Sequence, residues 1–261
     1  MALVVPGCLP AELKSHTADA FDAFIKKTEE RIDAEVKTNA LLWVEGTPAR
    51  LARVKRGEVV VGPYYGEPEI KVPDGLIHDW IGSIFIPGAT LAETLKLVQD
   101  YDNHKYLYQP EVIDSRLLMR DGNDFKIHLQ LLKKKVLTVV LNTDHDVRYF
   151  PLSPARERSR SYSTRIAEVE HYGHPEQREL PPGKDHGFLW KLYSYWRFEE
   201  RDGGTFVECE AISLTRGIPP GIAWAIKPMI RSLPRESLGR TLLATRKALT
   251  KEGVPRPGAT E

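Results

Sequence analysis

The chain has 261 residues, of which 41% are hydrophobic and 28% are charged, a composition typical of a folded protein with a sizeable core. Its 37 basic and 36 acidic residues give a net charge of +1, so no global field favours binding to nucleic acid or to an anionic membrane. The two cysteines, Cys8 and Cys209, are too few for a disulfide framework or for a zinc site built on paired cysteines.

The first ten residues contain a short apolar stretch that ends in Val5-Pro6-Gly7-Cys8. Because it lacks a positively charged leading segment and a full apolar core, we expect a disordered tail and not a signal peptide. The compartment stays open between the cytoplasm and, if a signal was trimmed, the periplasm. No run approaches the roughly 18 apolar residues of a membrane helix.

The residues before 76 are predicted to form an extension packed on a main domain, because 75 residues are few for a separate core. A helix is expected from Ser15 to about Thr38, where apolar residues recur at helical spacing. Ala49–Val54 and Glu58–Tyr65 flank Lys55-Arg56-Gly57 and predict a β-hairpin. Another strand is expected near Glu69–Val72 before a Pro-Asp-Gly turn.

The main domain is predicted to span residues 76–251, with 252–261 as a disordered tail. It begins with a strand, Leu76–Ile86, which ends at Pro87-Gly88. A helix starts at Ala89 or Thr90, and a short helical segment, Asp102–Tyr108, stops before Pro110.

A series of strands with turn signals between them follows. Their predicted ranges are Val112–Arg120, Phe125–Leu132, Val136–Tyr149, Ser159–Glu170, Gly187–Glu199 and Thr205–Thr215. The last two strands, joined by Asp202-Gly203-Gly204, form the clearest hairpin. A closing helix with Pro234 in its first turn is expected to run to about Thr250.

This order of elements, together with two sequence segments, resembles the START-like superfamily. The segments are Gly217-Ile218-Pro219-Pro220 and Arg231-Ser232-Leu233-Pro234-Arg235-Glu236-Ser237-Leu238. Asp79-Trp80-Ile81-Gly82 to Asp100-Tyr101-Asp102-Asn103-His104, and Ser194-Tyr195-Trp196-Arg197-Phe198-Glu199-Glu200, resemble bacterial SRPBCC-type proteins more closely. The superfamily includes lipid-transfer domains, polyketide cyclases and coenzyme-Q-binding proteins, and the likeness covers about two thirds of the chain.

The resemblance implies an α+β helix-grip fold, in which a curved antiparallel sheet wraps around a long C-terminal helix. It also implies an internal cavity that binds or transfers a hydrophobic small molecule, such as a lipid or an isoprenoid quinone. The alternative is a cyclase or dehydratase that acts on a polyketide-like substrate in the same cavity. An interaction module that uses the N-terminal helix is a third hypothesis.

Strand alternation predicts which residues line the cavity. The even positions from Phe188 to Phe198 are expected to face inward, as are Val207, Cys209, Ala211 and Ser213 on the partner strand. Glu208 and Glu210 are expected to face outward and to pair with Lys191 or Arg197. Large aromatic residues opposite small ones suit a pocket wall and equally suit an ordinary core. The predicted ligand-binding residues are Trp190, Leu192, Ser194, Trp196, Phe198, Leu129, Leu141, His145, Tyr101, His104 and Trp224.

Among these, His145, Tyr101 and His104 are the candidates for acid–base chemistry in the enzyme hypothesis. His128 is expected on the other face of its strand, in solvent. Asp144, His145 and Asp146 alternate in direction along a strand and cannot all bind one ion, so no metal site and no cofactor are predicted. Lys133-Lys134-Lys135 is interpreted as a solvated turn.

No motif of a catalytic nucleophile, a phosphate-binding loop or a zinc protease is present in the sequence. Cys209 is expected to be a buried core residue. The resemblance and the mostly apolar inward rows imply that the partner is a hydrophobic small molecule, with no nucleic acid and no obligate protein partner. A transient membrane contact stays open.

Overall fold

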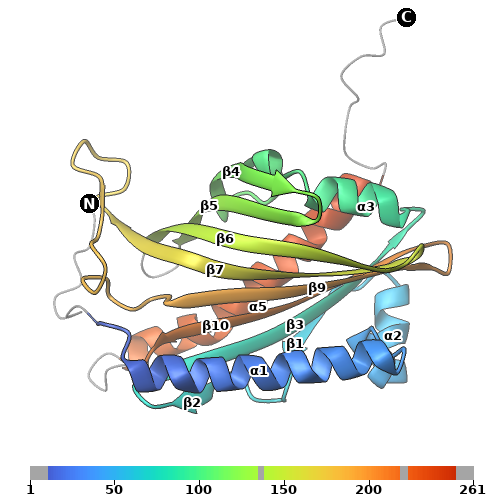
Figure 1. The fold of residues 1–261 in the computed structure, drawn as a ribbon, viewed down its shortest axis with the longest axis horizontal. Helices are drawn as coiled ribbons and strands as arrows, with labels where there is room; N and C mark the ends of the chain where they lie inside the picture. Colours follow the sequence, from blue (N-terminus) through green and yellow to red (C-terminus); the bar gives the residue numbers. More distant parts are fainter. Residues whose placement is uncertain (1–10, 135–137, 218–222, 251–261) are drawn as a thin grey trace, which may run out of the picture.

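The computed structural model describes residues 11–134, 138–217 and 223–250, and of residues 223–232 it describes the backbone alone. In these ranges one antiparallel sheet dominates the molecule (Figure 1). Its strands run in the order β1-β3-β10-β9-β7-β6-β5-β4, and β2 and β8 pair with β3 and β7. The strands are β1 (Val60–Pro63), β2 (Ile70–Val72), β3 (Gly75–Pro87), β4 (Val112–Asp121), β5 (Asp124–Lys134), β6 (Thr138–Ser153), β7 (Arg156–Glu170), β8 (Arg178–Glu179), β9 (Lys191–Arg201) and β10 (Gly204–Arg216).

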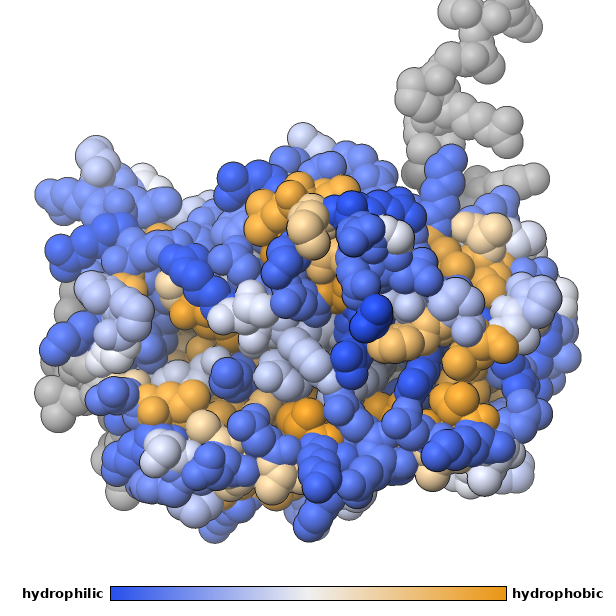
Figure 2. Space-filling view, viewed as in Figure 1, coloured by the Kyte–Doolittle hydropathy of each residue, from blue (hydrophilic) through white to orange (hydrophobic). Residues whose placement is uncertain are grey.

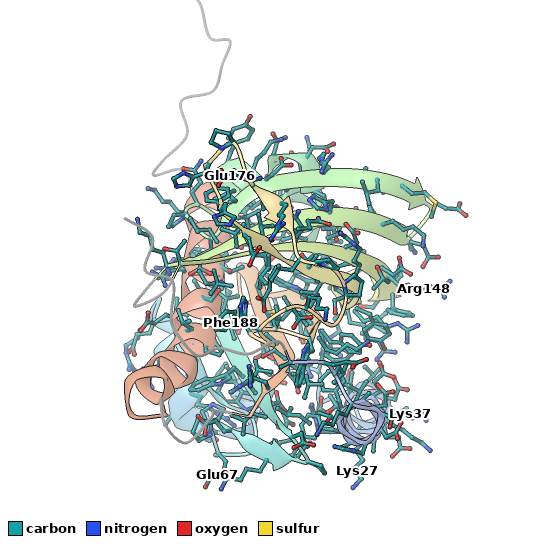
Figure 3. All side chains as sticks on the ribbon, turned by 90° about the vertical axis from the view of Figure 1, so that its left-hand side faces the viewer. Lys27, Lys37, Glu67, Arg148, Glu176 and Phe188 are labelled. Atoms are coloured by element: carbon teal, nitrogen blue, oxygen red, sulfur yellow. The ribbon has the colours of Figure 1, made fainter. Side chains whose placement is uncertain are left out.

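Helices cover both faces of the sheet. They are α1 (Ser15–Lys37), α2 (Pro48–Lys55), α3 (Leu91–Val98), α4 (His104–Leu107) and α5 (Ala223–Leu249), with 3-10 turns η1 (Trp43–Gly46) and η2 (Tyr101–Asn103). Figure 3 views the sheet from one end, with α5 on one side and α1, which carries Lys27 and Lys37, on the other. We call the face toward α5 the inner face and the face toward α1 the outer face.

Two local features hold the helices at the inner face. Thr90 and Glu93 form a capping box at the start of α3, in which each side chain accepts a hydrogen bond from the other residue's backbone N–H. At the crossing of β3 and α5, Gly82 lacks a side chain where a Cβ atom would lie 2.7 Å from Leu242. Because of this, α5 packs directly on the strand, and Leu238 and Leu242 join the apolar core of the inner face.

The outer face buries two apolar clusters. Phe21, Ile25 and Ile32 of α1 pack on Ile77, Tyr195, Ile212 and Leu214 of the sheet. A second cluster joins Val54 of α2 to Phe85 and Phe206. The N-terminal segment therefore adds a third layer, and the odd-numbered side chains of β9 lie beneath it and not in solvent.

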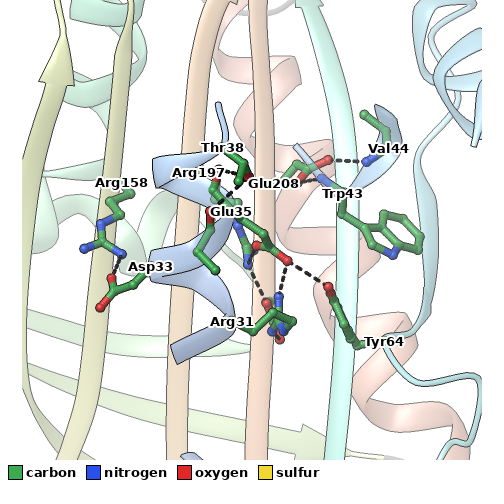
Figure 4. Close-up of polar contacts among 12 residues, drawn as sticks. Arg31, Asp33, Glu35, Thr38, Trp43, Val44, Tyr64, Arg158, Arg197 and Glu208 are labelled. Carbon is green, nitrogen blue, oxygen red and sulfur yellow. Dashed lines mark hydrogen bonds and ion pairs between the residues drawn. The ribbon is translucent and has the colours of Figure 1, made fainter. Parts of the chain in front are cut away.

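Charged side chains are also buried beneath α1 (Figure 4). Arg197, 1% exposed, donates to Glu210 at 2.7 Å, and Arg31 of α1 donates to the same carboxylate at 2.5 Å. Glu208 accepts hydrogen bonds from the backbone N–H groups of Trp43 and Val44 at 2.8 and 3.0 Å. We call Arg31, Asp79, Arg197, Glu208 and Glu210 the outer charge cluster. The expected pairing of Arg197 is confirmed, but it is buried and not at the surface.

The structure confirms the helix-grip architecture, the N-terminal helix and the strand near residue 70. The hairpin predicted from Ala49–Val54 and Glu58–Tyr65 is wrong, because Pro48–Lys55 forms helix α2 and β1 pairs with β3. Pro48 occupies the first turn of α2 and is followed by strong helix formers. The closing helix begins at Ala223 and continues through Pro234, which is therefore not in its first turn. The domain boundary at residue 75 stays a prediction.

Polar side chains cover most of the surface seen in Figure 2, and hydrophobic ones form separate groups between them. Within the described residues no helix is long and apolar enough to cross a membrane.

Candidate functional site

A cavity of about 370 Å³ lies between the inner face of the sheet, the segment from α3 to α4, and α5. Its wall is mainly apolar, with Ile127, Leu129 and Leu131 on β5, Val139, Leu141 and Val147 on β6, and Leu233 and Leu238 on α5. The volume and the lining are those of a site for a small apolar molecule.

Strand alternation places the inner residues of the β9–β10 hairpin in the wall. Leu192, Ser194 and Trp196 come from β9, and Cys209, Ala211 and Ser213 come from β10. Trp196 is directly opposite Cys209 in the pairing register, and Ser194 is opposite Ala211. The small residues of β10 thus leave the space that larger ones would fill.

Eight of the eleven residues predicted to bind a ligand line this cavity, and their contact with a ligand stays a prediction. They are Leu192, Ser194, Trp196, Leu129, Leu141, His145, Tyr101 and His104. The inner rows of β5, β6 and β9 therefore have the expected direction. The side chain of Trp224 lies outside the part of the chain that the structure describes.

Two predicted residues lie elsewhere. Phe198 is fully buried in the core next to the cavity, with its ring stacked 6.0 Å from that of Trp196. Trp190 packs with the apolar cluster that α1 covers on the outer face, and its indole N–H donates to Asp185 at 3.3 Å. Its expected inward direction is wrong, because regular strand geometry begins only at Lys191 and alternation does not hold before it. Phe188 does line the cavity, on the side where Figure 3 shows α5.

His145 is the most central imidazole of the wall. It is 4% exposed, and its two ring nitrogens lie 3.0 Å from the Thr143 hydroxyl and 3.3 Å from the Ser161 hydroxyl. Burial lowers the pKa of His145 to about 4, so the ring is neutral near pH 7.

A group of aromatic polar side chains lies toward α3 and α4. The Tyr101 and Tyr149 hydroxyls are 3.0 Å apart, and the His104 ring lies 4.9 Å from the Tyr101 ring. His104 Nε2 is 3.1 Å from the Val98 carbonyl oxygen, and burial lowers the pKa of His104 to about 4. Burial also raises the pKa values of both tyrosines above their ordinary value. All these groups are neutral near pH 7.

A charged cluster that sequence reasoning missed lies where β4 and β5 meet α5. Lys133 donates to Ser237 at 2.6 Å and also bonds to Glu111, and Arg240 lies 2.8 Å from the other Glu111 oxygen. Burial favours neutral Glu111, but Lys133 and Arg240 outweigh it and hold the pKa of this carboxyl below its ordinary value. The interpretation of Lys133 as part of a solvated turn is wrong, because its side chain folds under α5 and is only 24% exposed.

His128 occupies the opposite face of β5, as expected, but it is 8% exposed and not solvated. Its Nδ1 lies 2.7 Å from Asp144 on the neighbouring strand. Among the residues that the structure describes, no group of three or more His, Cys, Asp or Glu side chains could hold a metal ion.

The wall therefore offers neutral hydrogen-bonding groups and one compensated ion cluster. General acid–base catalysis near pH 7 is most efficient when the pKa of the catalytic group lies close to the working pH. Burial moves the pKa values of His145, His104 and Tyr101 away from that range. These three candidates do line one cavity, as the enzyme hypothesis requires. Their pKa values, however, do not favour acid–base catalysis near pH 7.

No protein-family model matches the sequence, and no curated protein matches it. Solved structures do resemble the fold. A STAR-related lipid transfer protein from Xanthomonas axonopodis has 16% identity and a TM-score of 0.47, with 69% of this chain and 97% of that chain covered. A START superfamily protein from Mycobacterium smegmatis has 12% identity and a TM-score of 0.42, with 66% and 96% covered. The Zhui aromatase/cyclase from a Streptomyces species has 14% identity and a TM-score of 0.41, with 68% and 99% covered.

Because these likenesses are weak, the fold assignment depends on the strand order and the closing helix. The antiparallel order β3-β10-β9-β7-β6-β5-β4, with α3 and α4 between β3 and β4 and with α5 packed on the inner face, is the helix-grip arrangement that the sequence resemblance implied. The chain therefore has the helix-grip fold.

Proposed function

We propose that the protein binds one hydrophobic small molecule in the cavity beneath α5. The observation that carries the proposal is a mainly apolar wall around about 370 Å³. At the packing density of protein interiors this space holds roughly 15 to 20 non-hydrogen atoms. A compact ring system or a single short chain fits this size, whereas a two-chain phospholipid does not fit inside.

The closing helix is the candidate gate. Leu233, Pro234, Ser237, Leu238 and Thr241 of α5 line the cavity, whereas no residue of the loop Pro87–Thr90 does. A movement of α5 away from the sheet would open the cavity along its length. Transfer of the ligand between membranes, with a transient membrane contact, is a further part of the proposal. Nucleic acid and an obligate protein partner are not part of it.

Native mass spectrometry of the purified protein, followed by solvent extraction, tests the proposal. We expect a bound apolar molecule or, for empty protein, saturable binding of an added fluorescent apolar probe. Ala211→Phe fills the cavity from β10 and should abolish binding, while Ala92→Phe on the exposed side of α3 should leave it intact. Protein that is always empty and binds no apolar probe would overturn the proposal.

The second candidate is a cyclase or dehydratase, favoured by the convergence of Tyr101, His104 and His145 on one cavity. Turnover of a polyketide-like substrate that is lost in His145→Gln, with substrate binding kept, would support it. Binding of the same substrate without turnover at any pH between 4 and 9 would reject this candidate and leave the binding proposal standing.

A further inference from the structure

Four serines form a polar cluster at the centre of the cavity's otherwise apolar sheet surface. Ser194 of β9 is directly opposite Ser161 of β7 in the pairing register. Ser159 lies two residues from Ser161 on the same strand, and Ser213 of β10 lies two residues beyond Ala211, which is opposite Ser194. All four line the cavity. Opposite residues on one face have Cβ atoms about 5 Å apart and diagonal ones about 7 Å apart, so Ser161, Ser159 and Ser213 are all neighbours of Ser194, and Ser159 and Ser213 lie on opposite sides of it.

Three of these hydroxyls have no side-chain partner in the part of the chain that the structure describes. Ser161 lies 3.3 Å from His145, but within the described residues Ser159, Ser194 and Ser213 make no side-chain hydrogen bond. Other buried hydroxyls, by contrast, form hydrogen bonds with the backbone. Thr143 donates to the Leu129 carbonyl at 3.0 Å, and Ser163 accepts from the Leu192 N–H at 3.0 Å. The hydroxyls of Ser159, Ser194 and Ser213 therefore line the cavity without a side-chain partner among the described residues.

An apolar ligand that covered these hydroxyls would displace the water bound to them without forming a hydrogen bond in its place. An unsatisfied buried polar group costs about 1–3 kcal/mol, whereas a hydrogen bond to the ligand would offset this cost. The site thus favours a ligand with an oxygen atom above Ser194 over one of the same shape without it.

The groups around Ser194 also determine whether the oxygen-containing group of the ligand can be charged. His145, the nearest imidazole, is neutral near pH 7 because burial lowers its pKa to about 4. Lys133 lies six residues along β5 from Ile127, the residue opposite His145, which is roughly 20 Å at the rise of a strand. Lys133 is also bonded to Glu111. Arg216 lies five residues along β10 from Ala211, the residue opposite Ser194, which is roughly 17 Å at the rise of a strand, and it donates to the His186 carbonyl at 3.1 Å. A charged group above Ser194 would be buried without a counterion, at a large cost.

We propose that the ligand carries a neutral oxygen function, a carbonyl or a hydroxyl, which the serine cluster binds at the middle of the cavity. This inference rests on the proposed binding function and specifies the chemical class of its ligand. An uncharged carbonyl would accept from Ser194 and a neighbouring serine, and a ligand hydroxyl could also donate to one of them.

Three probes of equal shape test the inference: acetylnaphthalene, isopropylnaphthalene and naphthoate, all substituted at the same ring carbon. They present a neutral carbonyl, no oxygen and a carboxylate at one position. Affinities are measured by fluorescence titration for the wild type and for Ser194→Ala, with Ser15→Ala on the exposed start of α1 as the control.

Ser194→Ala should weaken acetylnaphthalene about five- to tenfold, and it should leave isopropylnaphthalene unchanged or tighten its binding. Naphthoate should bind the wild type at least tenfold more weakly than acetylnaphthalene. Ser15→Ala should change none of the three affinities. If the ketone and the hydrocarbon respond equally to Ser194→Ala, or if naphthoate binds as tightly as the ketone, the inference is wrong. If none of the probes binds any variant, the proposed binding function itself fails.

Discussion

The two faces of the sheet handle buried polar groups in opposite ways. On the outer face, charged side chains such as Arg197 and Glu210 are bonded to each other and to α1 (Figure 4). On the inner face, Ser159, Ser194 and Ser213 are uncharged and have no side-chain partner among the described residues. The two sets share strands, since Arg197 and Ser194 lie on β9 and Glu210 and Ser213 lie on β10.

The two sets of polar groups therefore have different roles: the paired charges stabilise the structure, and the free hydroxyls are available to a ligand. Buried charges are costly unless they are paired, so the outer cluster makes the position of α1 on the sheet specific. Free hydroxyls in a cavity add nothing to the stability of the fold, but they are available to a ligand. Groups of the first kind should therefore matter for stability, and groups of the second kind for binding.

The largest effect is expected from Arg197→Met. This change leaves Glu210 and Glu208 buried without their main cation, and loss of one partner of a buried pair costs about 3–5 kcal/mol. Denaturant unfolding measures the loss of stability. The control is Arg148→Met, which removes an exposed pair with Asp124 and should cost about 0.5 kcal/mol or less. Equal stability of the two variants would contradict a structural role of the outer cluster.

Above about pH 6.5 the pH dependence of stability should come from the outer face. Burial and the neighbouring Glu210 raise the pKa of Asp79 from 3.8 to about 8, and burial raises the pKa of Glu208 from 4.5 to about 7. Between about pH 6.5 and 8 the folded state then binds more protons than the unfolded state, so stability should fall as pH rises. Between pH 4 and 6.5 the lowered pKa values of His145 and His104 act in the opposite direction, because the unfolded state protonates these rings first.

The change Asp79→Asn removes one of these groups and should reduce the slope by up to about 1.4 kcal/mol per pH unit. The free energy of unfolding is measured from pH 4 to 8 for both proteins. Asp146→Asn, at an exposed position of β6, serves as the control and should keep the wild-type slope. A wild-type stability that is constant or rising between pH 6.5 and 8 would contradict the prediction.

The contact between the inner face and α5 can be tested with two glycines. Gly82→Ala places a Cβ atom 2.7 Å from the Leu242 side chain, so this buried side chain or the helix must shift and stability should fall by about 1–3 kcal/mol. Gly239→Ala, on α5, meets no atom closer than 3.8 Å and should stabilise the helix by about 0.5–1 kcal/mol. Thermal unfolding of both variants measures the difference, and the same sign for both would contradict this account of the crossing.

The smallest effect on stability is expected from Ser159→Ala. Its hydroxyl points into the cavity and bonds to no described residue, so the free energy of unfolding should change by about 0.5 kcal/mol or less. Ser163→Ala on the same strand removes the acceptor of the Leu192 N–H and should cost about 1–2 kcal/mol. Ser159→Ala that destabilises as much as Ser163→Ala would remove the distinction between the two kinds of serine.

Much of the site could be predicted from alternation within regular strands. Leu129, Leu141, His145 and Ser194 have the expected direction because each lies inside a continuous ladder. Trp190 lies one residue before its strand, where the backbone is irregular, and it packs on the opposite face. Lys133 was missed because its partners Glu111 and Ser237 are distant in the sequence.

The sequence by itself determined the strands of the main domain, the closing helix and the faces of the long hairpin, because these follow from local periodicity and turn residues. Only the tertiary structure decided that the outward charges of β9 and β10 are buried beneath α1. It also decided that Ser159, Ser194 and Ser213 have no side-chain partner among the described residues. Both depend on which segments cover each face, and side-chain alternation gives direction but not the covering element.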